Sequence, residues 1–124
     1  MSVYLKCVFK ADDEKMAKFQ QTEMLERLTL VIADEAVKIN PLSLAENASE
    51  AGTWDIHWEF SASIADEDHV SKQVRDAVGS PWDTASDGET RYRSPGTGGY
   101  SDAFSLCRSA EVSVKRSFLK NLFG

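Results

Sequence analysis

Apolar and polar residues alternate without a break from Thr53 to Ile64, where the chain reads TWDIHWEFSASI. Successive side chains of a β-strand point to opposite faces of the sheet, so this period of two predicts a strand near residues 53–64. One face carries Trp54 and Trp58, two of the three tryptophans, and is expected to lie on a core. The other face is polar, so we expect it to meet water or a partner.

The same period of two marks the start of the chain. Apolar residues occupy the odd positions from Val3 to Phe9, which predicts a strand near residues 2–10. Two strands alone make a sheet of marginal stability, so a third strand is expected near residues 89–94, or alternatively near residues 104–114.

Helical spacing follows the first strand. Acids at positions 12–14 suit the positive end of a helix dipole, and Asn40-Pro41 stops a helix because the residue before a proline disfavours helical geometry. Between them, apolar residues recur at threes and fours: Met16, Phe19, Leu25, Leu28, Ile32, Ala36 and Ile39. This spacing predicts one helix near residues 13–39, or two helices that meet near Gln21-Thr22.

A second helix is predicted near residues 67–78. The acids that precede it suit a first turn, and Gly79-Ser80-Pro81 is a typical helix end. Its expected apolar stripe consists of Val70, Val74, Ala77 and Val78.

The last segment fits two structures. Its apolar residues lie at even positions from Phe104 to Val114, which suits a strand, and also at threes and fours from Cys107 to Leu122, which suits a helix. The absence of a turn signal favours a helix near residues 103–122. The alternative is a strand over residues 104–115 followed by a short helix.

These elements predict an α+β fold in which helices near residues 13–39, 67–78 and 103–122 pack on one face of a small antiparallel sheet. At 124 residues the chain is expected to form a single domain, residues 1–124. Residues 79–101 hold five of the seven glycines and two of the three prolines. We therefore expect this segment to be a long Gly/Ser/Pro-rich loop within the domain.

Charge is distributed unevenly. Residues 1–90 contain 18 acids and 8 bases, a balance of −10, whereas residues 91–124 contain 2 acids and 6 bases, a balance of +4. An acidic body repels nucleic acid, so we expect a protein partner with a basic surface and no direct nucleic-acid binding. No apolar run reaches the roughly 20 residues of a membrane span, and MSVYLKCVFK lacks a signal-peptide pattern. We expect no membrane association and a cytoplasmic location.

The two cysteines, Cys7 and Cys107, lie 100 positions apart. Disulfide frameworks usually contain four or more cysteines, and metal sites cluster theirs. Both residues are therefore expected to be free thiols that fill core space.

The polar face of the strand near residues 53–64 carries the main candidate chemistry. Asp55, His57 and Glu59 lie at same-face spacing, roughly 7 Å apart. A histidine with carboxylates is a common donor set for metals, and His69 would supply a second imidazole if its helix folds nearby. Adjacent side chains on a flat strand rarely converge on one ion, so we expect no metal, no cofactor and no catalytic residue.

Small size, acidic charge and the lack of a recognisable catalytic motif favour a protein-binding domain that occludes or neutralises a partner, of the immunity-protein or inhibitor type. One alternative is a small enzyme or metal-binding protein that uses His57 with Asp55 and Glu59; another is an assembly subunit. On the open sheet face, the expected binding residues are Tyr4, Lys6, Asp55, His57 and Glu59. In the loop, they are Trp82, Arg91, Tyr92, Arg93 and Tyr100.

Overall fold

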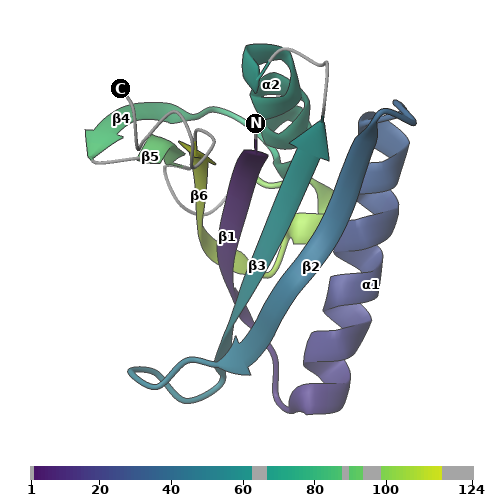
Figure 1. Cartoon of the computed structure of the whole chain (residues 1–124). Coiled ribbons are helices and arrows are strands. Elements are labelled where there is room, and N and C mark those ends of the chain that lie inside the picture. Colours follow the sequence, from purple (N-terminus) through teal and green to yellow (C-terminus); the bar gives the residue numbers. More distant parts are fainter. Residues whose placement is uncertain (1, 63–66, 88–89, 94–98, 116–124) are drawn as a thin grey trace.

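An antiparallel sheet of six strands has two helices along one side of it (Figure 1). The computed structural model describes residues 2–62, 67–87, 90–93 and 99–115, and these counts refer to that part of the chain. The elements in chain order are β1 (Ser2–Lys10), α1 (Glu14–Val31), β2 (Val37–Glu46), β3 (Thr53–Ala62), α2 (Glu67–Val78), β4 (Asp83–Asp87), β5 (Thr90–Arg93), η1 (Asp102–Phe104) and β6 (Cys107–Lys115). Across the sheet the order is β2-β3-β1-β6-β5-β4. The predicted α+β fold is confirmed.

The core lies between the sheet and the helices, and β1 runs through its centre. Leu5 of β1 lies opposite Trp58 of β3 on one side and Val112 of β6 on the other. All three side chains are fully buried. α2 packs against β1 and β6, while α1 packs against β2 and α2, so the helices cover this face. Burying one large apolar side chain stabilises a protein by roughly 1.5–3 kcal/mol, so this face stabilises the fold strongly.

Four predicted elements are confirmed. β1 occupies residues 2–10, and β3 covers the strand predicted near residues 53–64 up to Ala62, with residues 63 and 64 outside the described part. α2 matches residues 67–78, and every residue of its predicted stripe is fully buried. The strand predicted near residues 89–94 is β5, which lies between β6 and β4, with residues 89 and 94 outside the described part.

The helix predicted near residues 13–39 is wrong beyond Val31. α1 begins as expected, and Asp13 caps it by accepting a hydrogen bond from the Met16 N–H at 2.8 Å. After α1 the chain turns, and Asp34 Oδ1 accepts a hydrogen bond from the Ala36 N–H at 2.9 Å. From Val37 onward the chain is β2, paired with β3. Apolar residues continue to recur at threes and fours across this turn, so their spacing alone does not reveal the end of the helix.

Pro41 does not end a helix, because it lies within β2, a strand at one edge of the sheet. Proline has no N–H and is tolerated in an edge strand, where one side of the backbone has no strand beside it. The pairing register with β3 shifts between Pro41 and Ser43, next to the exposed Leu42.

The helix predicted near residues 103–122 is also wrong as far as the structure describes it. A short 3-10 turn, η1, leads into β6, which agrees from Cys107 onward with the alternative strand over residues 104–115. Residues 116–122 lie outside the described part. Both periods fit this segment, and pairing with β1 decides between them because it buries Ala110 and Val112.

The segment 79–101 contains β4 and β5, and its two ends are joined. The Ser80 N–H donates to the Gly99 carbonyl at 2.8 Å, and the Ser101 N–H donates to the Val78 carbonyl at 2.8 Å. A Cβ added at Gly79 would collide with the carbonyl oxygen of Gly99. The close approach of the two ends therefore requires glycine at position 79.

Among the described residues, no helix combines the length and the apolar character that a membrane crossing needs.

Gly79→Ala should lower the free energy of unfolding by about 2–3 kcal/mol, because the added methyl group forces two backbone segments apart. Gly52→Ala is the comparison: φ is +82° there, but no atom lies within 4 Å of the added Cβ. Its loss should be near 1 kcal/mol, the cost of left-handed geometry alone. Urea unfolding measures both variants. Equal losses would contradict the close contact at Gly79.

Candidate functional site

The predicted sheet-face residues lie together on the side of the sheet away from the helices. Asp55, His57 and Glu59 are each half-buried on β3, while their neighbours along the strand are buried on the helix side, Trp54 only partly. The register places Tyr4 of β1 opposite Glu59, and Lys6 opposite His57. The structure thus brings all five predicted residues of this face together.

Glu59 is held from both neighbouring strands. The Tyr4 hydroxyl of β1 donates to Glu59 Oε2 at 3.0 Å, and the Asn40 side-chain amide of β2 donates to Glu59 Oε1 at 3.4 Å. Both carboxylate oxygens therefore have a donor, and the side chain has a defined position on the face.

His57 and Asp55 have partners of their own. Ser43 Oγ of β2 shares a hydrogen bond of 2.9 Å with His57 Nδ1. The Asn47 side-chain amide donates to Asp55 Oδ1 at 2.9 Å. Together with the bonds to Glu59, these contacts direct the three side chains of the row to separate partners.

The described residues contain no group of three or more His, Cys, Asp or Glu side chains placed to hold a metal ion. His69 lies exposed on α2, which packs against the other face of the sheet. The structure therefore does not bring His69 to His57.

A shallow depression of about 220 Å³ lies on this same face. Tyr4, Lys6 and His57 line it, together with Glu111 and Ser113 of β6. Glu111 lies directly opposite Lys6 in the sheet. The depression therefore offers hydrogen-bonding groups and charges of both signs within a small area.

The predicted loop residues lie mostly against the body of the protein. Trp82, Tyr92 and Tyr100 are half-buried and pack against the core. Trp82 Nε1 donates to the Gly79 carbonyl at 2.7 Å, and the Arg75 guanidinium lies 3.7 Å from the centroid of the Tyr92 ring. These aromatic side chains attach the segment 79–101 to the fold, and their use in binding stays a prediction.

Arg91 and Arg93 belong to β5, and their side chains lie outside the described part of the structure. Their predicted role in binding also stays a prediction.

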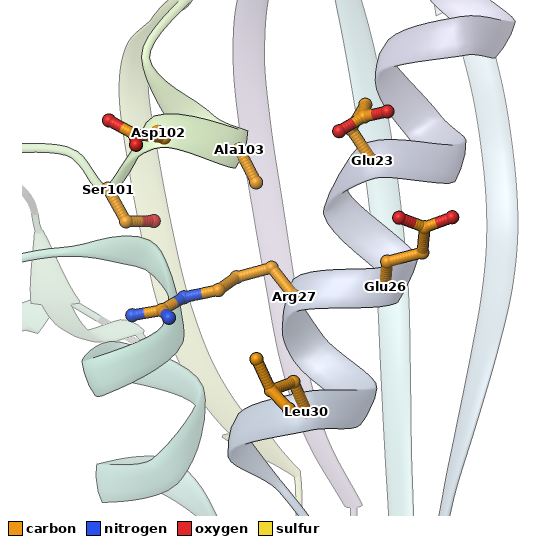
Figure 2. A pocket seen from close by; sticks show the side chains of 7 residues that line it. All are labelled: Glu23, Glu26, Arg27, Leu30, Ser101, Asp102 and Ala103. Carbon is orange, nitrogen blue, oxygen red and sulfur yellow. The ribbon is translucent and has the colours of Figure 1, made fainter.

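A larger hollow, which the sequence analysis missed, lies between α1 and η1 (Figure 2). Its volume is about 500 Å³. A second hollow of about 240 Å³ reaches Phe19 and shares Glu23, Asp102 and Ala103 with the first. We call the two neighbouring hollows together the α1–η1 groove. It is lined by Phe19, Gln20, Glu23, Glu26, Arg27, Leu30, Ser101, Asp102, Ala103 and Ser105.

Arg27 joins the elements around the groove. Its Nε donates to the Ala77 carbonyl near the C-terminal end of α2 at 3.1 Å, and the Ser101 hydroxyl donates to the same carbonyl at 2.7 Å. A cation there complements the negative end of the α2 dipole. Figure 2 shows Arg27 extending from α1 away from the carboxylates of Glu23 and Glu26.

The groove was missed because α1 turns a different side to the sheet from the one its large apolar residues suggest. The helix buries Ala17, Met24 and Leu28. Phe19 remains 59% exposed and Leu30 72% exposed. A competing stripe through Ala17, Met24 and Leu28 is present in the sequence, but its small alanine makes the signal weak.

Cys7 and Cys107 lie in contact within the core. β1 and β6 pair at this point, and both residues are buried free thiols, as predicted. Burial raises the pKa of Cys7 well above its ordinary value, and the hydrogen bond and charge of Cys107 raise it further. The Cys7 thiol is thereby kept in its protonated form.

Comparisons with models of protein families, with curated proteins and with solved structures found no significant match to this chain. The candidate site therefore has to be interpreted from its own geometry.

Tyr4→Phe should lower the free energy of unfolding by about 1 kcal/mol, because Glu59 Oε2 loses its part-buried donor. Ser43→Ala is the matched change at an exposed hydrogen bond and should cost less than about 0.5 kcal/mol. Denaturant unfolding compares the two variants with the wild type. Equal stability of Tyr4→Phe and wild type would show that this bond does not hold the face.

Cys7 should react with a thiol reagent at neutral pH only when the protein unfolds, because its raised pKa leaves almost no thiolate. Labelling with a disulfide reagent in native buffer and in denaturant measures this difference, with Cys107→Ser used to isolate Cys7. Rapid labelling of the folded variant would contradict the buried, protonated thiol.

Proposed function

We propose that the chain is a protein-binding domain that uses its open sheet face to occlude or neutralise a basic partner. The single observation that carries this proposal is the row of cross-strand hydrogen bonds that positions Asp55, His57 and Glu59. A surface whose side chains are already positioned loses less conformational entropy on binding, so it binds more tightly for a given contact area.

The charge of the chain supports a basic partner. Residues 1–90 carry a balance of −10. Complementary charge speeds the encounter of two proteins and suppresses wrong partners, and it weakens as salt screens it. An inhibitor or immunity-protein role and a cytoplasmic location remain part of the proposal.

The alternative functions receive no specific support from the described residues. An enzyme or metal protein built on His57 with Asp55 and Glu59 would need these side chains to act at one point, whereas each has a separate hydrogen-bond partner. The role of an assembly subunit also stays a prediction.

The test begins with capture of the partner from lysate of the native host by the tagged chain, at low salt and at about 0.5 M salt. The dissociation constant of the captured partner is then measured for the wild type and for the double variant D55N/E59Q. This variant keeps the shape of both side chains and removes their charges. We expect about tenfold weaker binding, which corresponds to about 1.4 kcal/mol.

The matched control is E14Q/E35Q, which removes the same total charge from two exposed positions outside the sheet face. It should change the dissociation constant by less than about twofold. Equal weakening by both variants would show that only net charge matters. Affinity that is unchanged at high salt would contradict the electrostatic part of the proposal.

A further inference from the structure

We infer that the α1–η1 groove binds an amphipathic helix of a partner protein, one with apolar side chains on one face and lysines or arginines beside them. The groove lies on the helix side of the sheet, whereas the face discussed above lies on the other side. This inference therefore does not depend on the proposed function of the sheet face.

The groove has an excess of negative charge. Three acidic residues belong to its lining, Glu23 and Glu26 of α1 and Asp102 of η1. Within the part of the chain that the structure describes, none of the three forms an ion pair. Arg27 is the basic residue of the lining, and its Nε is bound to the Ala77 carbonyl. Among the residues that the structure describes, no cation contacts these carboxylates, so they are available to basic side chains of a partner.

Apolar side chains lie at both ends of this wall. Phe19 and Leu30 are 11 positions apart on α1, which places them on the same side of the helix about 16 Å from each other. They are 59% and 72% exposed. Covering both with apolar side chains of a partner would remove them from water, which is the main favourable term in protein association.

A helix fits this groove better than an extended segment. α1 uses its backbone N–H and C=O groups within the helix, so this wall offers no strand edge for another backbone to pair with. An extended partner would leave its own backbone groups unpaired against the wall, whereas a helix pairs them internally. Apolar residues at helical spacing on the partner would contact Phe19 and Leu30 at the two ends of this wall.

The test uses a fluorescent synthetic helix of about 18 residues, which spans roughly 27 Å and so covers the groove. It carries leucines on one face and lysines on the flanks. Two other peptides serve as controls: the same composition in scrambled order, and a version with glutamate in place of lysine. The full-length chain should bind the amphipathic basic peptide at least about tenfold more tightly than either control.

Variants of the chain locate the binding surface. E23Q/E26Q should weaken binding of the basic helix about tenfold, whereas E14Q/E35Q, with the same net charge, should change it by less than about twofold. Leu30→Gln should weaken binding by a similar factor, and Leu42→Gln is its matched control at another exposed leucine. D55N/E59Q should bind the peptide as the control E14Q/E35Q does. Failure of the groove inference is therefore distinguishable from failure of the sheet-face proposal.

Nuclear magnetic resonance provides the direct readout. Backbone amide signals of α1 and of residues 101–105 should shift when the peptide is added, and peptide helicity should rise. Binding that falls equally in E23Q/E26Q and E14Q/E35Q would overturn the inference, because only overall charge would then be involved. Shifts confined to the sheet face, or no binding of the basic helix, would also overturn it.

Discussion

The pairing of β1 with β3 and β6 at the centre of the sheet is the constraint on which the remaining structure depends. Side chains alternate along a strand, so burying the odd positions from Val3 to Phe9 against the helices sends Tyr4 and Lys6 to the other side. Residues paired across neighbouring strands point to the same face, so β3 and β6 follow the same alternation as β1. The apolar core and the polar face are therefore two results of one pairing, and a slip by one residue would exchange them.

Where the sequence contains one unambiguous period, the fold follows it. The alternation in β1 and β3 and the stripe in α2 each match a buried face. Where two periods fit the same segment, long-range contacts determine its secondary structure. β6 is a strand because it pairs with the free side of β1. β2 is not evident from the sequence because the turn at Asp34, where the side chain and the carbonyl of Asp34 accept from the Ala36 and Val37 N–H groups, leaves the spacing of apolar residues unchanged.

The two surfaces differ in how far sequence alone can predict them. The row Asp55, His57 and Glu59 follows from alternation within one strand, so its position was predictable, although its partners on β2 were not. The α1–η1 groove joins residues that lie about seventy or more positions apart, such as Glu23 and Asp102. It also depends on which side of α1 faces the sheet, and the small Ala17 makes that choice hard to read from hydrophobicity.

Pro41 in the edge strand β2 has a consequence for how another molecule is recognised. An edge strand ordinarily offers a ladder of free backbone groups to which a second chain can add a strand. In β2 that ladder is interrupted by a residue without an N–H and by the register shift that follows it. Strand addition at this edge would be short and weak, and it would discriminate little between partner sequences. Selectivity on this side of the molecule therefore depends on side chains rather than on the backbone.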